Sequence, residues 1–316
     1  EFNIRKDGIL TNSDMYGYPA SHFSMPLESI ERIELVRGTG SLQYGAQFGG
    51  MLNYVSKKGD TSQTIGFENI TTAGSYNLLS NYTAIGGQVG KLNYYAYYQR
   101  KSREGYRDND QTRSEAQGIM LTYQFSTKIS LKMDWARSQY RYRIPGALTD
   151  SMFYADPTQA TRSRNYFSPD IHIPSLTLNW NISNNTELLF TTSSVLGNRS
   201  SVLFDKPTNV RDTINIITNN YNNRQVDIDN FHSYTSEIRI LHQYQLGNQR
   251  SFLTGGIQYM NNDLHRRQLG KGTTGSDYDL TLVTPGWGRD VHLKTSNISL
   301  FAENRFQLFE NLSVGV

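Results

Sequence analysis

A glycine-rich segment near the N-terminus is the first candidate for chemistry. Gly38-Thr39-Gly40 follows the short alternating run 30–36, as a phosphate-binding turn follows a strand in nucleotide-binding proteins. The dinucleotide fingerprint also needs a third glycine at a fixed spacing, a helix and an acidic residue about 20 residues further on. Residues 41–44 do not continue as a long amphipathic helix, and no Walker lysine follows. The segment therefore predicts a strand, an irregular turn and a second strand.

The sequence does not support a catalytic site or a metal-binding site. There is no nucleophile elbow, no triad spacing and no pair of carboxylates placed for acid–base work. Asp227 and Asp229 are too few for a calcium site. Cysteine is absent, which excludes disulfides and thiolate metal sites. The histidines are dispersed without metal-ligand spacing; they are His22, His172, His232, His242, His265 and His292. We expect a protein that is not an enzyme and has no catalytic residue, metal site or cofactor of its own.

Four arginines stand out by their spacing. Arg141 and Arg143 begin the polar stretch 142–171, and Arg162 and Arg164 lie near its end. One residue separates the two members of each pair, which places like charges on one strand face or one loop lip. Guanidinium groups bind carboxylates and phosphates through paired hydrogen bonds. The cluster is either an attractor of an anionic ligand or a solvated basic rim. The net charge of +3 is too small to indicate nucleic acid.

The elements that would position these residues are strands. After Gly59 the chain becomes a series of segments in which apolar and polar residues alternate, each roughly 10–16 residues long. The clearest are 92–99, 119–125, 129–135, 176–182, 237–245 and 298–307. A period of two with one apolar face predicts half-buried strands.

The connections between these segments alternate in length. Short ones fall at 90–91, 126–127, 183–185, 246–250 and 309–311, and long polar ones near 105–112, 142–171, 201–230 and 267–291. Such alternation indicates an up-and-down meander with short turns at one end and long loops at the other. Outer-membrane barrels are built in this way. A soluble sandwich would have shorter strands and scattered loop lengths.

Charged residues on the polar faces favour a barrel with a wet or plugged interior. We expect six of them to face inward, because a lysine or arginine facing lipid costs about 2–4 kcal/mol at the midplane. They are Lys132, Asp134, Glu237, Arg239, Glu303 and Arg305. Aromatic residues make up 12% of the chain, with 21 tyrosines, and many lie near strand ends. The alternative, aromatic pairing in a soluble sheet, does not account for strand length and loop alternation together.

The predicted fold is mainly β: an antiparallel up-and-down transmembrane β-barrel preceded by part of a small α+β plug. About ten complete strands fit, with an eleventh starting at Leu312, so we expect a partial barrel whose remaining strands follow in a longer chain. Residues 1–59 form the first unit, with a helical turn at 26–30, and residues 60–316 form the barrel. No apolar run reaches 18 residues, so no transmembrane helix is expected.

The opening region carries a family resemblance. The segments 33–38, 42–45 and 49–55 resemble the C-terminal end of the plug domain of TonB-dependent outer-membrane receptors. Asp7-Gly8-Ile9-Leu10 is similar to another plug segment of that family. Residues 16–22 and Tyr44-Gly45-Ala46-Gln47 resemble the ferric dicitrate branch, in particular its Bacteroidota type. The run 44–50 departs from the pattern of the glycan-importing relatives.

The resemblance implies a 22-stranded barrel in the outer membrane of a Gram-negative bacterium. It implies active import of a ferric chelate similar to ferric citrate, with the iron carried as cargo. The implied partners are TonB, through an N-terminal box not present in this sequence, the chelate, outer-membrane lipid and lipopolysaccharide. A transporter of the same class that imports another siderophore, cobalamin or a glycan is an alternative. The plug motif argues against a passive porin or adhesin.

The resemblance also indicates ligand-binding candidates at the extracellular mouth. On the plug they are Tyr16, Tyr18, His22 and Gln47; the tyrosines and the histidine could instead pack the plug against the barrel, and the glutamine could stabilise a turn. In the barrel they are the four arginines of the stretch 142–171, whose alternative is a rim that contacts lipopolysaccharide phosphates.

A separate hypothesis concerns how the plug is held. Arg37 ends a plug strand where the plug is expected to meet the barrel wall, and a buried arginine there needs a carboxylate. Glu237 and Glu303 are its predicted partners. This contact would form a lock that yields when TonB pulls, and Arg37→Ala would test it through transport and plug retention.

Overall fold

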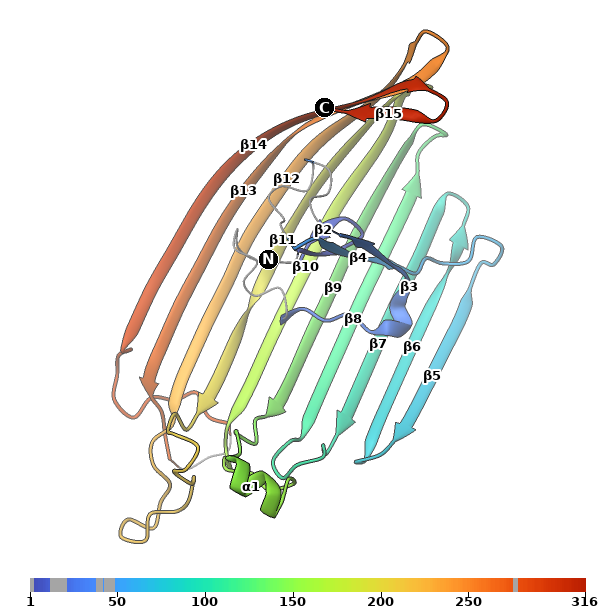
Figure 1. The fold of residues 1–316 in the computed structure, drawn as a ribbon. Coiled ribbons are helices and arrows are strands. Elements are labelled where there is room, and N and C mark those ends of the chain that lie inside the picture. Colours follow the sequence, from blue (N-terminus) through green and yellow to red (C-terminus); the bar gives the residue numbers. More distant parts are fainter. Residues whose placement is uncertain (1–2, 12–21, 38–41, 43–48, 275–277) are drawn as a thin grey trace.

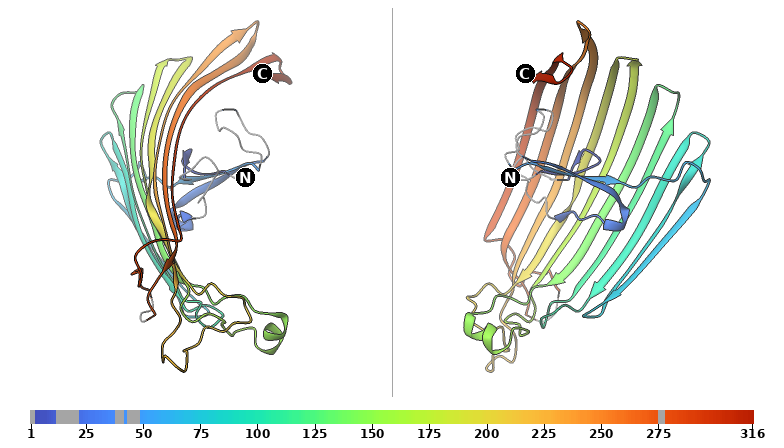
Figure 2. Two further views of the ribbon diagram at one scale, coloured as in Figure 1. Left: turned by 90° about the vertical axis from the view of Figure 1, so that its left-hand side faces the viewer. Right: turned by 45° about the vertical axis from the view of Figure 1, so that its right-hand side comes forward.

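The computed structural model describes residues 3–11, 22–37, 42, 49–274 and 278–316. In this part of the chain, eleven antiparallel strands follow one another in chain order in a single large sheet, which we call the wall. The strands are β5 (Gly66–Gly74), β6 (Leu78–Val89), β7 (Leu92–Arg103), β8 (Thr112–Gln124), β9 (Ile129–Arg143), β10 (Tyr166–Ser183), β11 (Thr186–Leu203), β12 (Gln225–Leu246), β13 (Gln249–Lys271), β14 (Arg289–Phe309) and β15 (Leu312–Gly315). The wall is curved, as Figure 2 shows.

The two ends of the wall differ. Tight turns join the strands at one end, and the long connections 104–111, 144–165, 204–224 and 272–288 gather at the other, the lower end in Figure 1. The connection 144–165 contains the one-and-a-half-turn helix α1 (Asp150–Ala155), whose first turn is capped by the Thr149 hydroxyl accepting from the Met152 amide. The later three of these long connections are shorter than expected, because their strands extend further into the polar stretches than the sequence suggested.

A second, small sheet lies against the concave side of the wall (Figure 2). It contains β1 (Asn3–Lys6), β2 (Ile9–Leu10), β3 (Ile30–Val36) and β4 (Met51–Ser56) in the order β2-β1-β4-β3, with the 3-10 turn η2 (Leu27–Ser29) before β3. Asp7 and Gly8 both have positive φ, which suits the tight Asp-Gly turn between β1 and β2. Residues 57–65 connect the two sheets.

The apolar contact between the sheets forms the largest core cluster. Ile9, Phe23 and Met25 of the small sheet's unit are buried against Ile171 and Phe231 of the wall, together with other inward-facing wall residues. Burial of each such side chain contributes about 1.5–3 kcal/mol relative to leaving it in water. The small sheet's unit is therefore held against the wall by apolar packing.

The wall's outer face is apolar along its middle. Ile119 and Met133 are about half exposed, at 48% and 51%, while their strand neighbours Met120 and Asp134 point inward and are buried. An isolated soluble sheet would not leave such a band in water, whereas a membrane-spanning wall places it in lipid.

The fold expected from the sequence is confirmed. The chain is mainly β, with ten long wall strands among the described residues, an eleventh beginning at Leu312, and a small sheet preceding them. The helical turn expected at 26–30 is η2. Within the described ranges, no helix has both the length and the apolar character needed to cross a membrane.

Candidate functional site

A chamber of about 1050 Å³ lies between the small sheet's unit and the wall, toward the long loops. Residues 23–28 form one side of it with Ile4, Ile30 and Tyr54, and the loop-proximal ends of β5 to β9 form the other. The polar wall residues that line it are Thr72, Ser80, Gln99, Lys101, Arg103, Thr112, Ser114, Glu115, Ser138, Tyr140, Tyr142 and Arg143. Gln99 marks the inward face, because its Nε2 donates to the Glu28 carboxylate at 2.9 Å.

The lining of the chamber is of mixed charge, with Lys101, Arg103 and Arg143 as cations and Glu28, Asp110 and Glu115 as anions. Lys101 and Arg103 lie one residue apart on β7 and share the inward-facing register of Gln99. The Arg103 guanidinium is 3.9 Å from the Asp110 carboxylate, a loose surface pair that leaves donors for another acceptor. Hydroxyl groups of serine, threonine and tyrosine surround them. This arrangement suits an oxygen-rich anion, which accepts from guanidinium, ammonium and hydroxyl donors together.

An aromatic and arginine row continues across the inner face. Tyr140 and Tyr142 stack at 6.0 Å, and Tyr142 lies 5.4 Å from the Phe167 ring. The Arg199 guanidinium covers Phe167 at 5.4 Å and forms an ion pair with fully buried Asp229 at 3.1 Å. The row continues from the chamber toward the middle of the wall.

His22 joins the small sheet's unit to this row. Its ring meets Phe167 edge-on at 5.1 Å and lies 6.3 Å from the Phe231 ring. Burial, with a further contribution from the Arg199 charge, lowers the pKa of His22 to about 4. His22 is therefore neutral at physiological pH and acts as a packing group.

We expect acid to loosen this contact. Because the folded-state pKa of His22 lies below its ordinary value of 6.5, its packing is fully stable above pH 6.5 and weakens as the pH falls toward 4, by about 1–2 kcal/mol at pH 5. Amide hydrogen exchange of residues 22–30 in the full-length protein should accelerate between pH 7 and pH 5, after correction for intrinsic rates. His22→Gln should remove this acceleration; an equal pH response in both proteins would contradict the assignment.

Four alternating charges connect the small sheet to the wall. The Lys6 ammonium donates to both carboxylate oxygens of Asp134 at 2.7 Å, and the Lys132 ammonium donates to Asp7 at 2.9 Å. Lys6 also lies 3.2 Å from Asp7, so the four groups form one network. Burial favours the neutral forms, but the neighbouring opposite charges outweigh it: the pKa of Lys6 is raised, and that of Asp7 lies well below its usual range.

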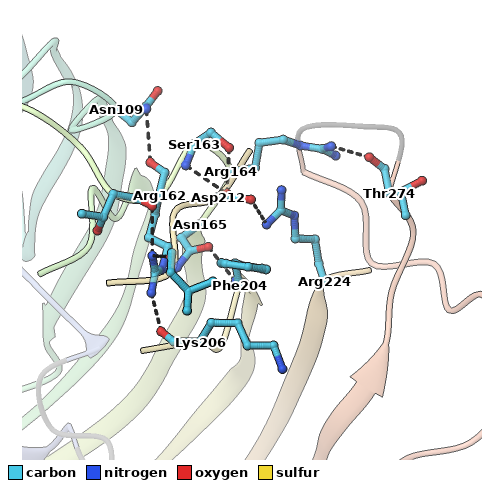
Figure 3. A network of polar contacts seen from close by, with 12 residues as sticks. Asn109, Arg162, Ser163, Arg164, Asn165, Phe204, Lys206, Asp212, Arg224 and Thr274 are labelled. Carbon is cyan, nitrogen blue, oxygen red and sulfur yellow. Dashed lines mark hydrogen bonds and ion pairs between the residues drawn. The ribbon is translucent and has the colours of Figure 1, made fainter. Parts of the chain in front are cut away.

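The long loops are fastened to one another by buried arginines (Figure 3). Arg162 donates to backbone carbonyls of residues 161, 206, 207 and 210, and Arg164 donates to the Thr274 carbonyl. Arg224 donates to Asp212 at 2.6 Å, and the second oxygen of Asp212 accepts from the Ser163 amide and hydroxyl. Three loops from distant parts of the sequence thus share one polar network.

No protein-family model matches the chain, but solved structures do. The ferric citrate transporter FecA in its unliganded form aligns with a TM-score of 0.78 at 17% identity, over 99% of this chain and 53% of that one. The ferric-catecholate import receptor Fiu from E. coli K12 gives 0.74 at 12%, over 99% and 51%. The pyoverdine outer membrane receptor FpvA from Pseudomonas aeruginosa PAO1, bound to pyoverdine, gives 0.71 at 13%, over 99% and 48%. The chain has the fold of these receptors.

The chain spans about half the length of the structures it matches. At these identities the similarity establishes the fold. The wall and the small sheet match part of the barrel and the plug in the fold of these receptors. We use the name plug for the small sheet with residues 22–29 below.

The structure places the first arginine pair on the other face of the wall. Tyr140 and Tyr142 face the chamber, so Arg141 and Arg143 point outward from the same strand. The Arg141 guanidinium stacks on the Tyr278 ring at 3.9 Å, and that of Arg143 lies 5.2 Å from the Tyr166 ring. Arg143 still contributes to the lining of the chamber near the loops, whereas Arg141 does not. A shift of one residue along a strand exchanges its two faces.

The second arginine pair lies inside the loop network. Arg162 and Arg164 are each only 6% exposed, and their guanidinium groups are engaged with loop carbonyls. They hold the long loops in position and do not form an exposed cationic edge. Of the plug candidates, His22 is buried against the wall, whereas Tyr16, Tyr18 and Gln47 lie outside the described residues.

The structure does not join Arg37 to its predicted partners. Arg37 is exposed after the edge strand β3, and it forms no ion pair with another described residue. Glu237 instead pairs with Arg239 and accepts from the Gln258 amide at 2.7 Å. Glu303 does meet the plug, but through the Leu42 backbone amide at 3.3 Å. The plug charges that reach the wall come from β1 and the turn after it, because these lie closest to β9.

Sequence reasoning missed the plug half of this contact. Lys132 and Asp134 were expected to face inward, and they do. Asp7 stands in the sequence prediction only as part of the segment 7–10 that resembles the plug, and Lys6 has no predicted role. A signal was present: adjacent opposite charges on the plug match the alternating Lys132 and Asp134 on β9, which is the pattern of a complementary interface.

Proposed function

We propose that this chain is the plug and part of the barrel of a TonB-dependent receptor that imports a ferric chelate across the outer membrane of a Gram-negative bacterium. The observation that carries the proposal is the plug seated on the concave face of the wall by an apolar core and buried ion pairs, with a polar chamber of mixed charge toward the loops. A passive porin does not require a plug bound to its wall in this way. An active importer needs one that holds firmly and releases under load.

The proposed cargo is an anionic chelate of the ferric citrate type. Lys101, Arg103 and the tyrosine hydroxyls offer charged and neutral donors to carboxylate and alkoxide oxygens. The similarity to a ferric citrate transporter supports this class. Catecholate and pyoverdine complexes are the cargo named for two other similar structures, and they remain the second choice.

Growth of a deletion strain tests the proposal. With ferric citrate as the sole iron source, growth should fail, and the full-length gene should restore it. Normal growth on ferric citrate with failure on another chelate would reassign the cargo. Normal growth on every iron source tested would contradict iron import altogether.

The chamber predicts an affinity effect. Lys101→Gln with Arg103→Gln removes two charged donors, and the affinity of the full-length protein for ferric citrate should fall about 10–100-fold. Titration followed by intrinsic tryptophan fluorescence measures it. Arg113→Gln with Arg141→Gln removes two positive charges from the outer face at the same height and should leave affinity unchanged. Equal losses in both double variants would indicate only a long-range charge effect.

A further inference from the structure

A depression of about 580 Å³ lies on the inner face of the wall at the end where tight turns join the strands, the upper end in Figure 1. Leu241 and Gln243 of β12 line it, and they continue the two-residue alternation of Phe231, which is buried against the plug. The pairing of β12 with β11 has no bulge, so this face does not change along the strand. The depression is therefore separate from the chamber, which lies toward the long loops.

Backbone hydrogen bonds hold the turns around this depression. The Asn181 amide donates to the Lys128 carbonyl at 2.8 Å, and the Gln243 amide donates to the Asn185 carbonyl at 2.8 Å. The Asn185 amide also donates to the Ser183 hydroxyl at 3.2 Å. These bonds join the turns 126–128 and 183–185 to the strands beside them, so the lining side chains start from an ordered backbone.

Polar side chains converge on the depression without partners of their own. Four side-chain amides line it, and none of them forms a hydrogen bond with a residue that the structure describes. They belong to Asn181, Asn184, Asn185 and Gln243. The Lys128 ammonium and the Glu187 carboxylate line it too, and neither has an ion-pair partner in the described ranges. Because an amide both donates and accepts, the depression offers donors, acceptors and one charge of each sign.

Two apolar side chains complete the lining. Leu241 is 38% exposed, and Phe252 on β13 is the register partner of Gln243. An aromatic ring surrounded by amides and a carboxylate suits a sugar, because sugar C–H groups pack on the ring while the hydroxyls pair with the polar groups. The volume lies within the range of small-molecule sites.

We propose that this depression binds an N-acetylated glycan that carries a carboxylate, which is the chemistry of the repeating unit of peptidoglycan. An acetamido group pairs with a side-chain amide through both its N–H and its C=O, and its methyl group packs on Leu241 and Phe252. The Lys128 ammonium binds the carboxylate. The proposal rests on the outer-membrane location proposed above, because the short turns of an outer-membrane barrel face the periplasm, where peptidoglycan lies.

The test measures binding of a soluble muropeptide, the disaccharide of N-acetylglucosamine and N-acetylmuramic acid with its stem peptide. Isothermal titration calorimetry of the purified full-length receptor, in a detergent without a sugar headgroup, should show binding. Asn181→Ala with Gln243→Ala should weaken it about tenfold, since two hydrogen-bonding amides are lost. Lys128→Gln should weaken it about fivefold and leave binding of the uncharged disaccharide of N-acetylglucosamine unchanged.

A matched control removes amides elsewhere at the same end of the wall. Asn248→Ala with Asn311→Ala takes two exposed amides from other turns, outside the depression, and should change nothing. Heat-modifiable gel mobility confirms that each variant is folded.

Three results would overturn the proposal. They are no muropeptide binding by the unmodified receptor, undiminished binding by the variant that lacks the Asn181 and Gln243 amides, and an equal loss in the turn control. Equal binding of cellobiose, which lacks the acetamido group and the carboxylate, would also overturn it by showing a general sugar surface.

Ferric citrate uptake by the same variants separates this site from the import function. Weakened muropeptide binding with normal uptake supports the site, whereas normal muropeptide binding with normal uptake refutes the site alone. Muropeptide binding that depends on Asn181 and Gln243, in a receptor whose deletion leaves growth on every iron source normal, would uphold the site and contradict import.

Discussion

Replacing Asp134 with alanine is expected to destabilise the attachment of the plug by about 3–5 kcal/mol. The Lys6 ammonium lies 2.7 Å from the Asp134 carboxylate, and the two side chains are only 5% and 6% exposed. Removing the carboxylate leaves a buried ammonium with Asp7 as its remaining ion-pair partner. Urea-induced release of the plug, followed by protease accessibility of the β1–β4 unit in the full-length protein, measures the change.

Two controls separate this pair from general effects of charge. Arg32→Ala should cost less than about 1 kcal/mol, because its pair with Glu34 is exposed. Lys6→Met with Asp134→Leu removes both charges and should recover most of the stability lost by Asp134→Ala, since an apolar pair avoids the cost of desolvating charges. If the double variant were as unstable as the single one, the ion pair would not be the cause.

The same network sets a pH window for the plug. The pKa of Asp7 is depressed in the fold, so its contribution is present above its ordinary value of 3.8 and is lost as the pH falls through the folded-state value. The pKa of Lys6 is raised, so its contribution is present below its ordinary value of 10.5 and is lost as the pH rises through the folded-state value. The contributions of Asp7 and Lys6 are therefore both present throughout the range between these two ordinary values, and the weakening expected at pH 5 belongs to His22.

Replacing Asp212 with alanine is expected to free the loops from one another. Asp212 and Arg224 are each 1% exposed in their side chains, and Asp212 also accepts from Ser163. Truncation leaves the Arg224 guanidinium buried without its carboxylate, a loss of about 3–5 kcal/mol. Amide hydrogen exchange in residues 204–224 should rise at least about 100-fold, because each 1.4 kcal/mol is a factor of ten.

The exposed Asp205 in the same loop provides the matched control. Asp205→Ala removes the same carboxylate group from a solvated position and should leave exchange unchanged. Asp212→Asn keeps the size and one acceptor oxygen, and it should give an intermediate rate. If exchange in 204–224 stayed slow in Asp212→Ala, the loop would be held by the Arg162 contacts alone.

The face of the sheet on which a side chain lies could be predicted from the sequence, because it follows from the two-residue period of a strand. Lys132 and Asp134 fall on the polar side of an alternating run, and a strand leaves them no other face. Continuing the same count along β9 assigns Tyr140 and Tyr142 to the chamber and Arg141 to the outside, because no bulge interrupts the pairing with β8. The arginine pair was chosen by charge and loop position, and the alternation was not carried to the end of the strand.

Contacts within the loops and contacts between distant parts of the chain could not be predicted from the sequence. Arg162 and Arg164 lie in a segment without periodicity, so nothing in their spacing shows that their partners are carbonyls of two other loops. Lys6 and Asp134 are 128 residues apart. Their pairing depends on where the plug sits on the wall, which depends in turn on the apolar contacts of Phe23, Ile171 and Phe231. The sequence alone shows these charged residues, but it does not show where the plug sits on the wall.

The position of β1 makes the plug mechanically anisotropic. β1 is an interior strand, bonded to β2 on one side and in parallel to β4 on the other over Asn3 to Lys6. A load applied along β1 through its N-terminal end stretches these bonds in shear, so they and the Lys6–Asp134 contact at the far end resist together. A load applied across the strand breaks the same bonds one after another, as in unzipping. The direction of pulling, as much as its strength, therefore decides whether this sheet opens.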